Sequence, residues 1–355
     1  MRTTLTERLA ELAVAVSLWG FRILVVFVVV AGTILTIRTG KYSGEQWIDF
    51  VVFGIARGSI YALIALGYTM VYGILRMINF AHGDVFMAGA FSGYFLTAAL
   101  SRSGFLDRYP IWTLLGAILI GMGVATGIAI ILERVAYRPL RKAPRLVPLI
   151  SAIGASFFLE YSFRGFFGPG IYAYPPVTIL QGEWTLLGIG ILRMQVLVAV
   201  AAFIMMAILY TIVMRTKIGK AMRAVSENKD VSALMGIDVD RIIVATFMIG
   251  AAMAGAAGVL YALMFRQVNF FMGFVPGIKA FTAAVLGGIG NIPGAMLGGI
   301  TLGIFESIGP ALFLDGLGIT RPYQLQDAIA FIMLVMVLLF RPSGLLGERL
   351  AVKKA

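Results

Sequence analysis

Long apolar segments alternate with short polar loops along the whole chain. A membrane-spanning helix needs about 20 consecutive apolar residues, with some tolerance for tilt. The segments predicted to be spans are 23–37, 47–75, 81–100, 111–132, 146–166, 194–214, 241–263, 276–290, 294–314 and 323–340. We therefore expect an all-α, polytopic membrane protein with about ten spans.

The eighth and ninth segments are separated only by Asn291-Ile292-Pro293. They are predicted to form a glycine-rich structure of short helices, either a tight hairpin or a pair of half-helices. Within it, Gly290, Gly294 and Gly298 lie four residues apart, a spacing typical of membrane helices that pack closely through small residues. These three glycines are predicted to be helix-packing positions.

Composition agrees with the membrane assignment. The chain of 355 residues is 60% hydrophobic and 13% charged, whereas a soluble domain carries roughly 25% charged residues. The net charge of +12 could indicate a nucleic-acid partner, but the basic residues gather in short loops beside apolar segments. That arrangement indicates the positive-inside rule and a lipid bilayer as partner, not nucleic acid.

Charge also predicts the orientation. Loop 133–145 holds five Arg/Lys against one Glu, and loop 215–241 holds six Arg/Lys. The tail contributes Arg341, Arg349 and two lysines, so all three regions are predicted to be cytoplasmic. Ten crossings with both termini in the cytoplasm satisfy every one of these assignments.

The N-terminal region carries an apolar stripe at helical spacing. Leu5, Leu9, Leu12, Val16 and Trp19 recur on one face. We expect residues 1–22 to form an amphipathic helix, either lying on the membrane or reaching a partner in the cytosol. The apolar run that follows has no small-residue cleavage site, which argues against a signal peptide. Residues 23–341 then form a transmembrane domain, and residues 342–355 form a cytoplasmic tail.

Several kinds of chemistry are missing from the sequence. There is no Gly-x-x-x-x-Gly-Lys-Ser/Thr phosphate loop, because Ile218-Gly219-Lys220-Ala221 lacks the upstream glycine and the hydroxyl residue. One histidine and no cysteine make a metal site improbable, and no catalytic set can be assembled. We expect no enzyme and no cofactor in this chain.

The stretch Ile78–Asp84, INFAHGD, places polar residues between two apolar segments and contains the single histidine. Non-helical backbone at membrane depth is tolerated only where protein covers it or it lines a cavity, and polar side chains there must face protein or water. Two roles stay open: Asn79 caps the next helix, or Asn79, His82, Gly83 and Asp84 form a break beside a transport pathway. His82 is expected to bond Asp84 or a carbonyl rather than to titrate.

A resemblance rests on four blocks. The longest, 58–100, reads GSIYALIALGYTMVYGILRMINFAHGDVFMAGAFSGYFLTAAL. The others are 138–160, 219–262 and 280–307, and together the blocks cover most of the chain from residue 47 onward. They resemble the permease family of ABC importers for branched-chain amino acids. INFAHGD is the most specific part of the match.

The resemblance implies a cytoplasmic helix that docks into a groove of an ATPase, with the form Glu-Ala-Ala-x-x-x-Gly. Asp230 to Gly236 keeps the acid and the glycine, but valine and serine replace the two alanines. An apolar strip of Ala224, Val231, Leu234 and Met235 amid charged residues would suit such docking; a solvated loop helix is the alternative. The predicted coupling residues are Arg223, Ala224, Glu227, Asp230, Leu234 and Gly236.

Charged residues inside the spans are few. Arg57 is expected to snorkel or to meet Glu160 or Glu306, and Glu160 could pair with Arg164 one turn along. A secondary transporter or channel acting alone would need paired ionisable groups near the membrane centre. No inverted repeat supports that alternative.

The resemblance therefore implies a multi-pass permease subunit in a bacterial inner membrane. Its implied partners are a second permease subunit in a heterodimer, two ATP-binding subunits that carry the ATP, and an extracytoplasmic substrate-binding protein. The implied cargo is a branched-chain or other hydrophobic amino acid. Similar permeases carry urea, short amides or broader sets of amino acids, so these remain alternatives.

Overall fold

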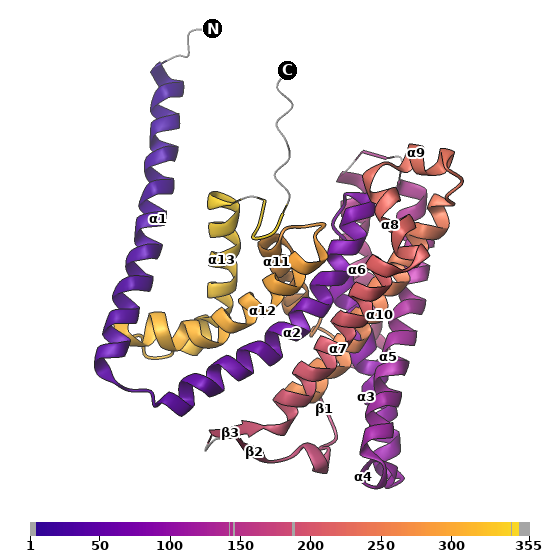
Figure 1. Ribbon diagram of the computed structural model, residues 1–355, viewed down its shortest axis with the longest axis horizontal. Coiled ribbons are helices and arrows are strands. Elements are labelled where there is room, and N and C mark those ends of the chain that lie inside the picture. The colour runs from indigo at the N-terminus through magenta and orange to yellow at the C-terminus, as the bar shows by residue number, and fades with distance from the viewer. Residues whose placement is uncertain (1–4, 142, 145, 187–188, 342, 348–355) are drawn as a thin grey trace.

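The computed structural model describes residues 5–141, 143–144, 146–186, 189–341 and 343–347. These residues are mainly α-helical (Figure 1). The α-helices are α1 (Leu5–Thr39), α2 (Gly44–Leu75), α3 (His82–Arg102), α4 (Phe105–Arg108), α5 (Pro110–Leu132), α6 (Leu146–Phe167), α7 (Arg193–Arg215), α8 (Lys217–Glu227), α9 (Lys229–Leu234), α10 (Val239–Phe265), α11 (Phe274–Gly287), α12 (Ile292–Gly309) and α13 (Gln326–Phe340).

Short elements extend or join these helices. The single-turn helices are η1 (Glu133–Tyr137), η2 (Arg138–Leu140), η3 (Thr178–Leu180), η4 (Pro310–Leu314), η5 (Asp315–Leu317) and η6 (Pro322–Leu325). Two antiparallel strand pairs join β1 (Tyr172–Ala173) to β4 (Gln267–Val268), and β2 (Glu183–Leu186) to β3 (Ile189–Leu192).

The predicted all-α, polytopic class is confirmed. Nine helical stretches in the described part of the chain are long and apolar enough to cross a membrane, and α11 is a shorter apolar helix of 14 residues. Each predicted span corresponds to one of these ten. The fourth runs further than predicted, because η1 and η2 continue α5 as far as Leu140.

The N-terminal region differs from the prediction. Residues 5–39 form one helix with no end near residue 22, so a separate surface helix is wrong for the part described. From Leu12 onward its apolar side chains are largely exposed, and Figure 1 shows α1 standing apart from the other helices. Its backbone contact lies near its end, where a Cβ on Gly32 would come 1.9 Å from the Phe313 carbonyl oxygen. From the middle of α1, Arg22 donates to the Leu339 carbonyl of α13 at 3.2 Å. Most of α1 therefore faces lipid.

Glycines bring the central helices into backbone contact. A Cβ on Gly303 of α12 would sit 2.3 Å from the backbone of Gly58 on α2, and one on Gly299 would sit 2.5 Å from Ala62. In the same way, a Cβ on Gly89 of α3 would sit 2.4 Å from the Cα of Gly255 on α10. Lipid tails are as apolar as the side chains, so no hydrophobic effect drives helices together inside a bilayer. Close packing at small residues stabilises the helix contacts instead.

The glycine-rich hairpin is formed by α11 and α12. Gly294 and Gly298 lie where α12 packs on α11, since a Cβ at either would come within 2.4 Å of a carbonyl oxygen. Gly290 does not pack: it lies in the turn with φ +97°, and an added Cβ would meet no atom within 4 Å. The predicted packing role of Gly290 is therefore wrong. A glycine at this position allows the positive φ that the turn requires. Asn291 caps α12 and also donates to the carbonyl of Leu346, which fixes the start of the tail here.

The two faces of the bundle are distinct. Figure 1 places α8, α9, the beginning of α1 and the end of α13 on one side, and α4, β2 and β3 on the other. The basic loops predicted to be cytoplasmic thus share a face with both ends of the described helical bundle. The excess of Lys and Arg assigns that face to the cytoplasm.

The chain contains no cysteine, so single cysteines can test this orientation. Ser103→Cys follows α3 on the outer side, and Ala233→Cys lies in exposed α9. A membrane-impermeant maleimide added to intact cells should label Ser103→Cys and leave Ala233→Cys unmodified until the membrane is opened. The reverse pattern would overturn the topology.

Candidate functional site

The helix break between α2 and α3 is the centre of the candidate site. Here α2 ends at Arg76, whose φ of 57° places a non-glycine residue in the left-handed region. That conformation terminates a helix but costs free energy when the residue has a Cβ. The Arg76 guanidinium donates to the carbonyl of Ser226 on α8, over 3.4 Å. The break is thus tied to the cytoplasmic helices.

Asn79 is held by a helix from another part of the chain. It is 4% exposed, and its side-chain oxygen accepts a hydrogen bond of 2.5 Å from the Tyr137 hydroxyl on η1. The residue that caps α3 is Ala81, with no side-chain cap bond. The predicted capping role of Asn79 is therefore wrong; the side chain joins the break to the end of the α5–η1 helix instead.

His82 is buried behind the break. Its ring meets that of Tyr68 edge to face at 4.8 Å, and Nε2 lies so close to Gly67 that a Cβ there would come within 2.2 Å. Asp84 forms its hydrogen bond with Ser156, so the predicted His82–Asp84 bond is not present. Nε2 has no hydrogen-bond partner among the described residues. His82 therefore acts through packing and, as the predicted alternative of a bond to a carbonyl has it, through a hydrogen bond with the backbone of Ile64.

Gly83 allows α11 to cover the break. A Cβ on Gly83 would come 2.5 Å from the carbonyl oxygen of Gly273, and one on Gly273 would come 2.3 Å from that of Gly83. One turn along α11, a Cβ on Gly277 would come 3.1 Å from the Gly83 Cα. Three glycines therefore bring two backbones together, and any larger residue would push them apart.

A cavity of about 250 Å³ opens beside this contact. It is enclosed by α2, the break, the middle of α6 and the start of α11. Its lining is Tyr68, Phe80, Gly83, Asp84, Ile153, Ser156, Phe157, Glu160, Gly273, Phe274, Gly277 and Ile278. The walls are mainly aromatic and aliphatic, and the polar groups converge from α3 and α6. Mostly apolar cavities with a few placed polar groups are typical of small-molecule sites.

The structure therefore divides the four residues of the predicted break. Gly83 and Asp84 line the cavity, whereas Asn79 and His82 lie behind it and support it. The Ser156 hydroxyl donates to the Asp84 carboxylate. Sequence reasoning missed Ser156, because nothing in its own segment distinguishes a serine inside an apolar helix from one that bonds its own backbone.

A second polar group joins four helices inside the membrane. Glu306 of α12 is fully buried and pairs with Arg57 of α2 at 2.9 Å and with Lys279 of α11. Lys279 also reaches Asp327 of α13 at 2.6 Å. The predicted alternative of an Arg57–Glu306 pair is confirmed. Lys279 and Asp327 were missed, because no spacing in the sequence relates residues on different helices.

The charged side chains of this group are paired with one another. Arg57 also donates to the Tyr61 hydroxyl at 2.8 Å and to Gln326 at 3.2 Å. Two cations and two carboxylates are together neutral, as expected of ionisable groups that must remain inside a bilayer. The cluster holds α2, α11, α12 and α13 in register.

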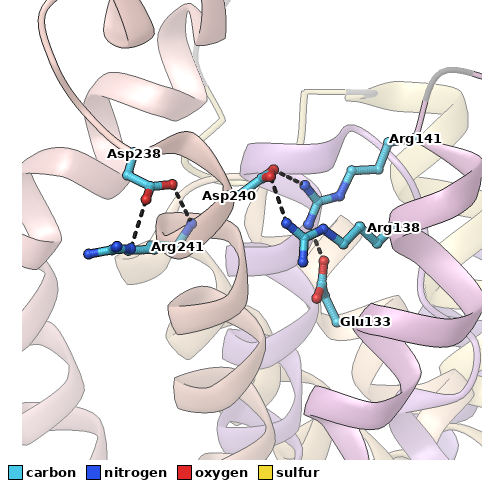
Figure 2. A network of polar contacts seen from close by, with 6 residues as sticks. All are labelled: Glu133, Arg138, Arg141, Asp238, Asp240 and Arg241. Atoms are coloured by element: carbon cyan, nitrogen blue, oxygen red, sulfur yellow. Dashed lines mark hydrogen bonds and ion pairs between the residues drawn. The ribbon is translucent and has the colours of Figure 1, made fainter.

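The cytoplasmic face carries an ion network, shown in Figure 2. Asp240 of α10 accepts from Arg138 at 2.9 Å and from Arg141 at 2.5 Å. Arg141 also pairs with Glu133, whose side chain is fully buried. Beside them, Asp238 caps α10 and pairs with Arg241 at 2.7 Å. The network fixes η1 and η2 to the start of α10, and thereby holds Tyr137 against Asn79.

The predicted coupling residues lie on α8, α9 and the turn after them. Thr216 caps α8, and Asn228 caps α9. Arg223 donates to the Val213 carbonyl at 2.6 Å, and Ala224 is half-buried. Glu227 and Asp230 are exposed, and Gly236 has φ +82°.

The predicted apolar strip is present in part. Leu234 is 87% exposed and Met235 77%, and Val231 beside them is also exposed, whereas Ala224 turns inward. These three apolar side chains are exposed together on α9 and the turn after it. The strip is therefore Val231, Leu234 and Met235.

Known proteins resemble this chain over most of its length. The sequence model of the family described as "Branched-chain amino acid transport system / permease component" matches residues 50–338. BraD of Pseudomonas aeruginosa, a high-affinity branched-chain amino acid transport system permease protein, is 45% identical over 306 residues, covering 85% of this chain and 96% of BraD. LivH of Escherichia coli K12, described in the same words, is 42% identical over 313 residues, covering 86% and 97%.

A solved structure, PsaBC from Streptococcus pneumoniae in complex with Fab, is 12% identical with a TM-score of 0.38, covering 86% of this chain and 94% of that one.

Tyr137→Phe tests how much the break depends on its link to η1. The change removes the donor to Asn79 and leaves a buried amide oxygen unsatisfied, which should destabilise the protein by about 1–3 kcal/mol. Tyr210→Phe, on the exposed face of α7, is the control and should have no effect. Equal thermal unfolding midpoints for the two variants in detergent would contradict the assignment.

Glu306→Gln tests the four-helix charge cluster. Removing the buried charge leaves two cations opposite one half-exposed carboxylate, and breaking a buried pair of this kind costs about 3–5 kcal/mol. Asp327→Asn, whose side chain is 48% exposed, should cost much less. The yield of monodisperse protein in size-exclusion chromatography measures both. A larger loss of monodisperse protein for Asp327→Asn than for Glu306→Gln would show that the cluster depends mainly on its contact with α13.

Proposed function

The chain belongs to the permease-component family of branched-chain amino acid transport systems, and on that premise we propose that it passes branched-chain or other hydrophobic amino acids inward as a subunit of an ABC importer. It is a multi-pass protein of the bacterial inner membrane. The observation that carries the proposal is the cavity of about 250 Å³, with aromatic and aliphatic walls, beside the helix break. Such walls suit an apolar side chain better than urea or a short amide.

Separate subunits supply the energy. The sequence has no phosphate loop, so ATP would be bound and hydrolysed by two ATPase subunits and this chain would perform no chemical step. Val231, Leu234 and Met235 would enter a groove of one ATPase as a short helix enters an apolar groove. Arg223, Glu227 and Asp230 would border that contact.

A short physical route leads from this surface to the cavity. Burial and the neighbouring guanidinium groups of Arg141 and Arg76 lower the pKa of Lys229 at the start of α9. Lys229 of α9 thus lies within electrostatic reach of Arg141 in the ion network and of Arg76 at the break. Arg76 bonds α8, and seven residues further on Gly83 already lines the cavity. A displacement of α8 and α9 would reach the cavity through the break.

A second permease subunit would complete the pathway. Ile153, Phe157 and Phe274 line the cavity and are also 39–51% exposed in the single chain. We propose that this face, on α6 and the start of α11, meets the second permease subunit of a heterodimer. An extracytoplasmic binding protein would deliver the amino acid to the opposite side of the membrane from α8 and α9, where the β1–β4 and β2–β3 pairs lie.

Reconstitution tests the function. Vesicles that contain this chain, the second permease and the two ATPases, with the binding protein added outside, should take up leucine, isoleucine and valine only when ATP is present inside. Uptake without the ATPases would identify a transporter that acts alone. Uptake of urea in preference to leucine would assign the chain to an amide importer.

Leu234→Asp tests the docking surface. A charge at the centre of the strip would have to be buried without a partner in the ATPase groove, so the ATPase should no longer co-purify and ATP-driven uptake should be lost. Leu192→Asp, an exposed leucine on the opposite side of the membrane, should leave co-purification unchanged. Retention of the ATPase by Leu234→Asp would place the coupling surface elsewhere.

A further inference from the structure

Glu160 enters the cavity without a partner. It is 4% exposed overall, lies in the second half of α6 and lines the cavity. Among the described residues its carboxylate takes part in no hydrogen bond or ion pair, and its oxygens keep a small accessible surface on the cavity side. The predicted pair with Arg164 is wrong: that guanidinium lies over the rings of Tyr161 and Phe270, at 5.9 and 5.3 Å. Arg164 acts on this carboxylate only through space, so the group has no direct partner in a largely apolar cavity, where a charge is costly unless something pairs with it.

Asp84 approaches the same space from α3. Its carboxylate accepts from Ser156, which is one turn before Glu160 on α6. The cavity lining therefore contains two carboxylates and the hydroxyls of Ser156 and Tyr68, and no lysine or arginine. Of the two hydroxyls, that of Ser156 donates to Asp84. The lining therefore offers the two carboxylates no cationic side chain and no side-chain N–H group. A ligand can supply both.

We propose that Asp84 and Glu160 bind the ammonium group of the translocated amino acid while its side chain packs against Phe80, Phe157 and Phe274. The inference rests on the proposed function, because it takes the transported amino acid as the occupant. An ammonium group offers three N–H donors and a positive charge, and charge-assisted hydrogen bonds to carboxylates are the strong ones.

The dimensions and walls favour an organic cation over a metal ion. One water takes about 30 Å³ of liquid volume, so a cavity of about 250 Å³ has room for a molecule of several non-hydrogen atoms. A small metal ion would gain nothing from the aromatic walls. No lysine or arginine lines the cavity, so nothing there would pair with the carboxylate of an amino acid. Asp84 and Glu160 would bind the ammonium end, and the carboxylate of the ligand would lie away from these two residues.

Two fragments of leucine separate these contributions. The probes are 3-methylbutylammonium, which is leucine without its carboxylate, and 4-methylpentanoate, which is leucine without its ammonium group. Saturation-transfer NMR on the purified permease–ATPase complex, without binding protein, measures weak binding of each. The ammonium probe should bind and be displaced by leucine, and 4-methylpentanoate should bind about tenfold more weakly or not at all, since it lacks a charge-assisted bond.

Glu160→Gln keeps the shape of the side chain and removes the charge. It should weaken binding of 3-methylbutylammonium about tenfold or more, and Asp84→Asn should act in the same direction. Glu183→Gln, an exposed carboxylate on β2, is the matched control and should bind as the unmodified complex does. If Glu160→Gln fails to assemble, the comparison of the two probes on the unmodified complex still decides the question.

Equal binding of the two probes, or tighter binding of 4-methylpentanoate, would overturn the assignment. So would unchanged binding in an assembled Glu160→Gln complex. ATP-driven uptake of leucine in vesicles is measured separately. If the vesicles take up leucine but the binding assay shows no preference for 3-methylbutylammonium, the site is rejected and the proposed function is kept. If 3-methylbutylammonium binds but no hydrophobic amino acid is taken up, the proposed function is rejected.

Discussion

The structure depends on how a membrane protein covers exposed backbone. A peptide group buried away from water needs a hydrogen-bond partner within the protein, yet the chain interrupts its helices between Leu75 and His82. The glycine contact between Gly83 and Gly273 resolves this conflict, because it lets α11 lie directly on the break. Tyr137 closes the same break from the other side through Asn79. The cavity lies beside this covered backbone.

Two polar clusters then fix what the glycines bring together. In the membrane, Glu306 with Arg57 and Lys279 ties α12 to α2 and α11, and so sets the position of the helix that covers the break. On the cytoplasmic face, Asp240 with Arg138 and Arg141 anchors the segment that carries Tyr137. The break thus has one rigid polar cluster on each side. Among the described residues, one hydrogen bond joins it to α8, from the Arg76 guanidinium to the Ser226 carbonyl. That contrast makes the break the part most able to respond to α8 and α9.

Local patterns predicted the helices well, because a span is a property of one segment. Apolar length located the nine helices long enough to cross a membrane and the shorter α11, and Lys and Arg predict their direction. Relations between segments were less accessible. Asn79 precedes a helix in the sequence, which suggested a cap, but its partner Tyr137 lies 58 residues away. Gly290 had the spacing of a packing residue and proved to be a turn residue, since spacing alone does not reveal backbone conformation. Lys279 carried no local signal, and its partners lie on separate helices.

The central claim is that the helix break links the cytoplasmic helices to the cavity. The most direct measurement uses Ile278→Cys, on the α11 wall of the cavity, in an otherwise cysteine-free complex reconstituted in vesicles. Its rate of reaction with a small water-soluble thiol reagent is compared between the nucleotide-free state and a state trapped with an ATP analogue on the ATPases. The account predicts that trapping changes the rate severalfold, because closure of the ATPases displaces α8 and α9 and thereby the break. Equal rates in the two states, with the ATPases bound, would contradict it.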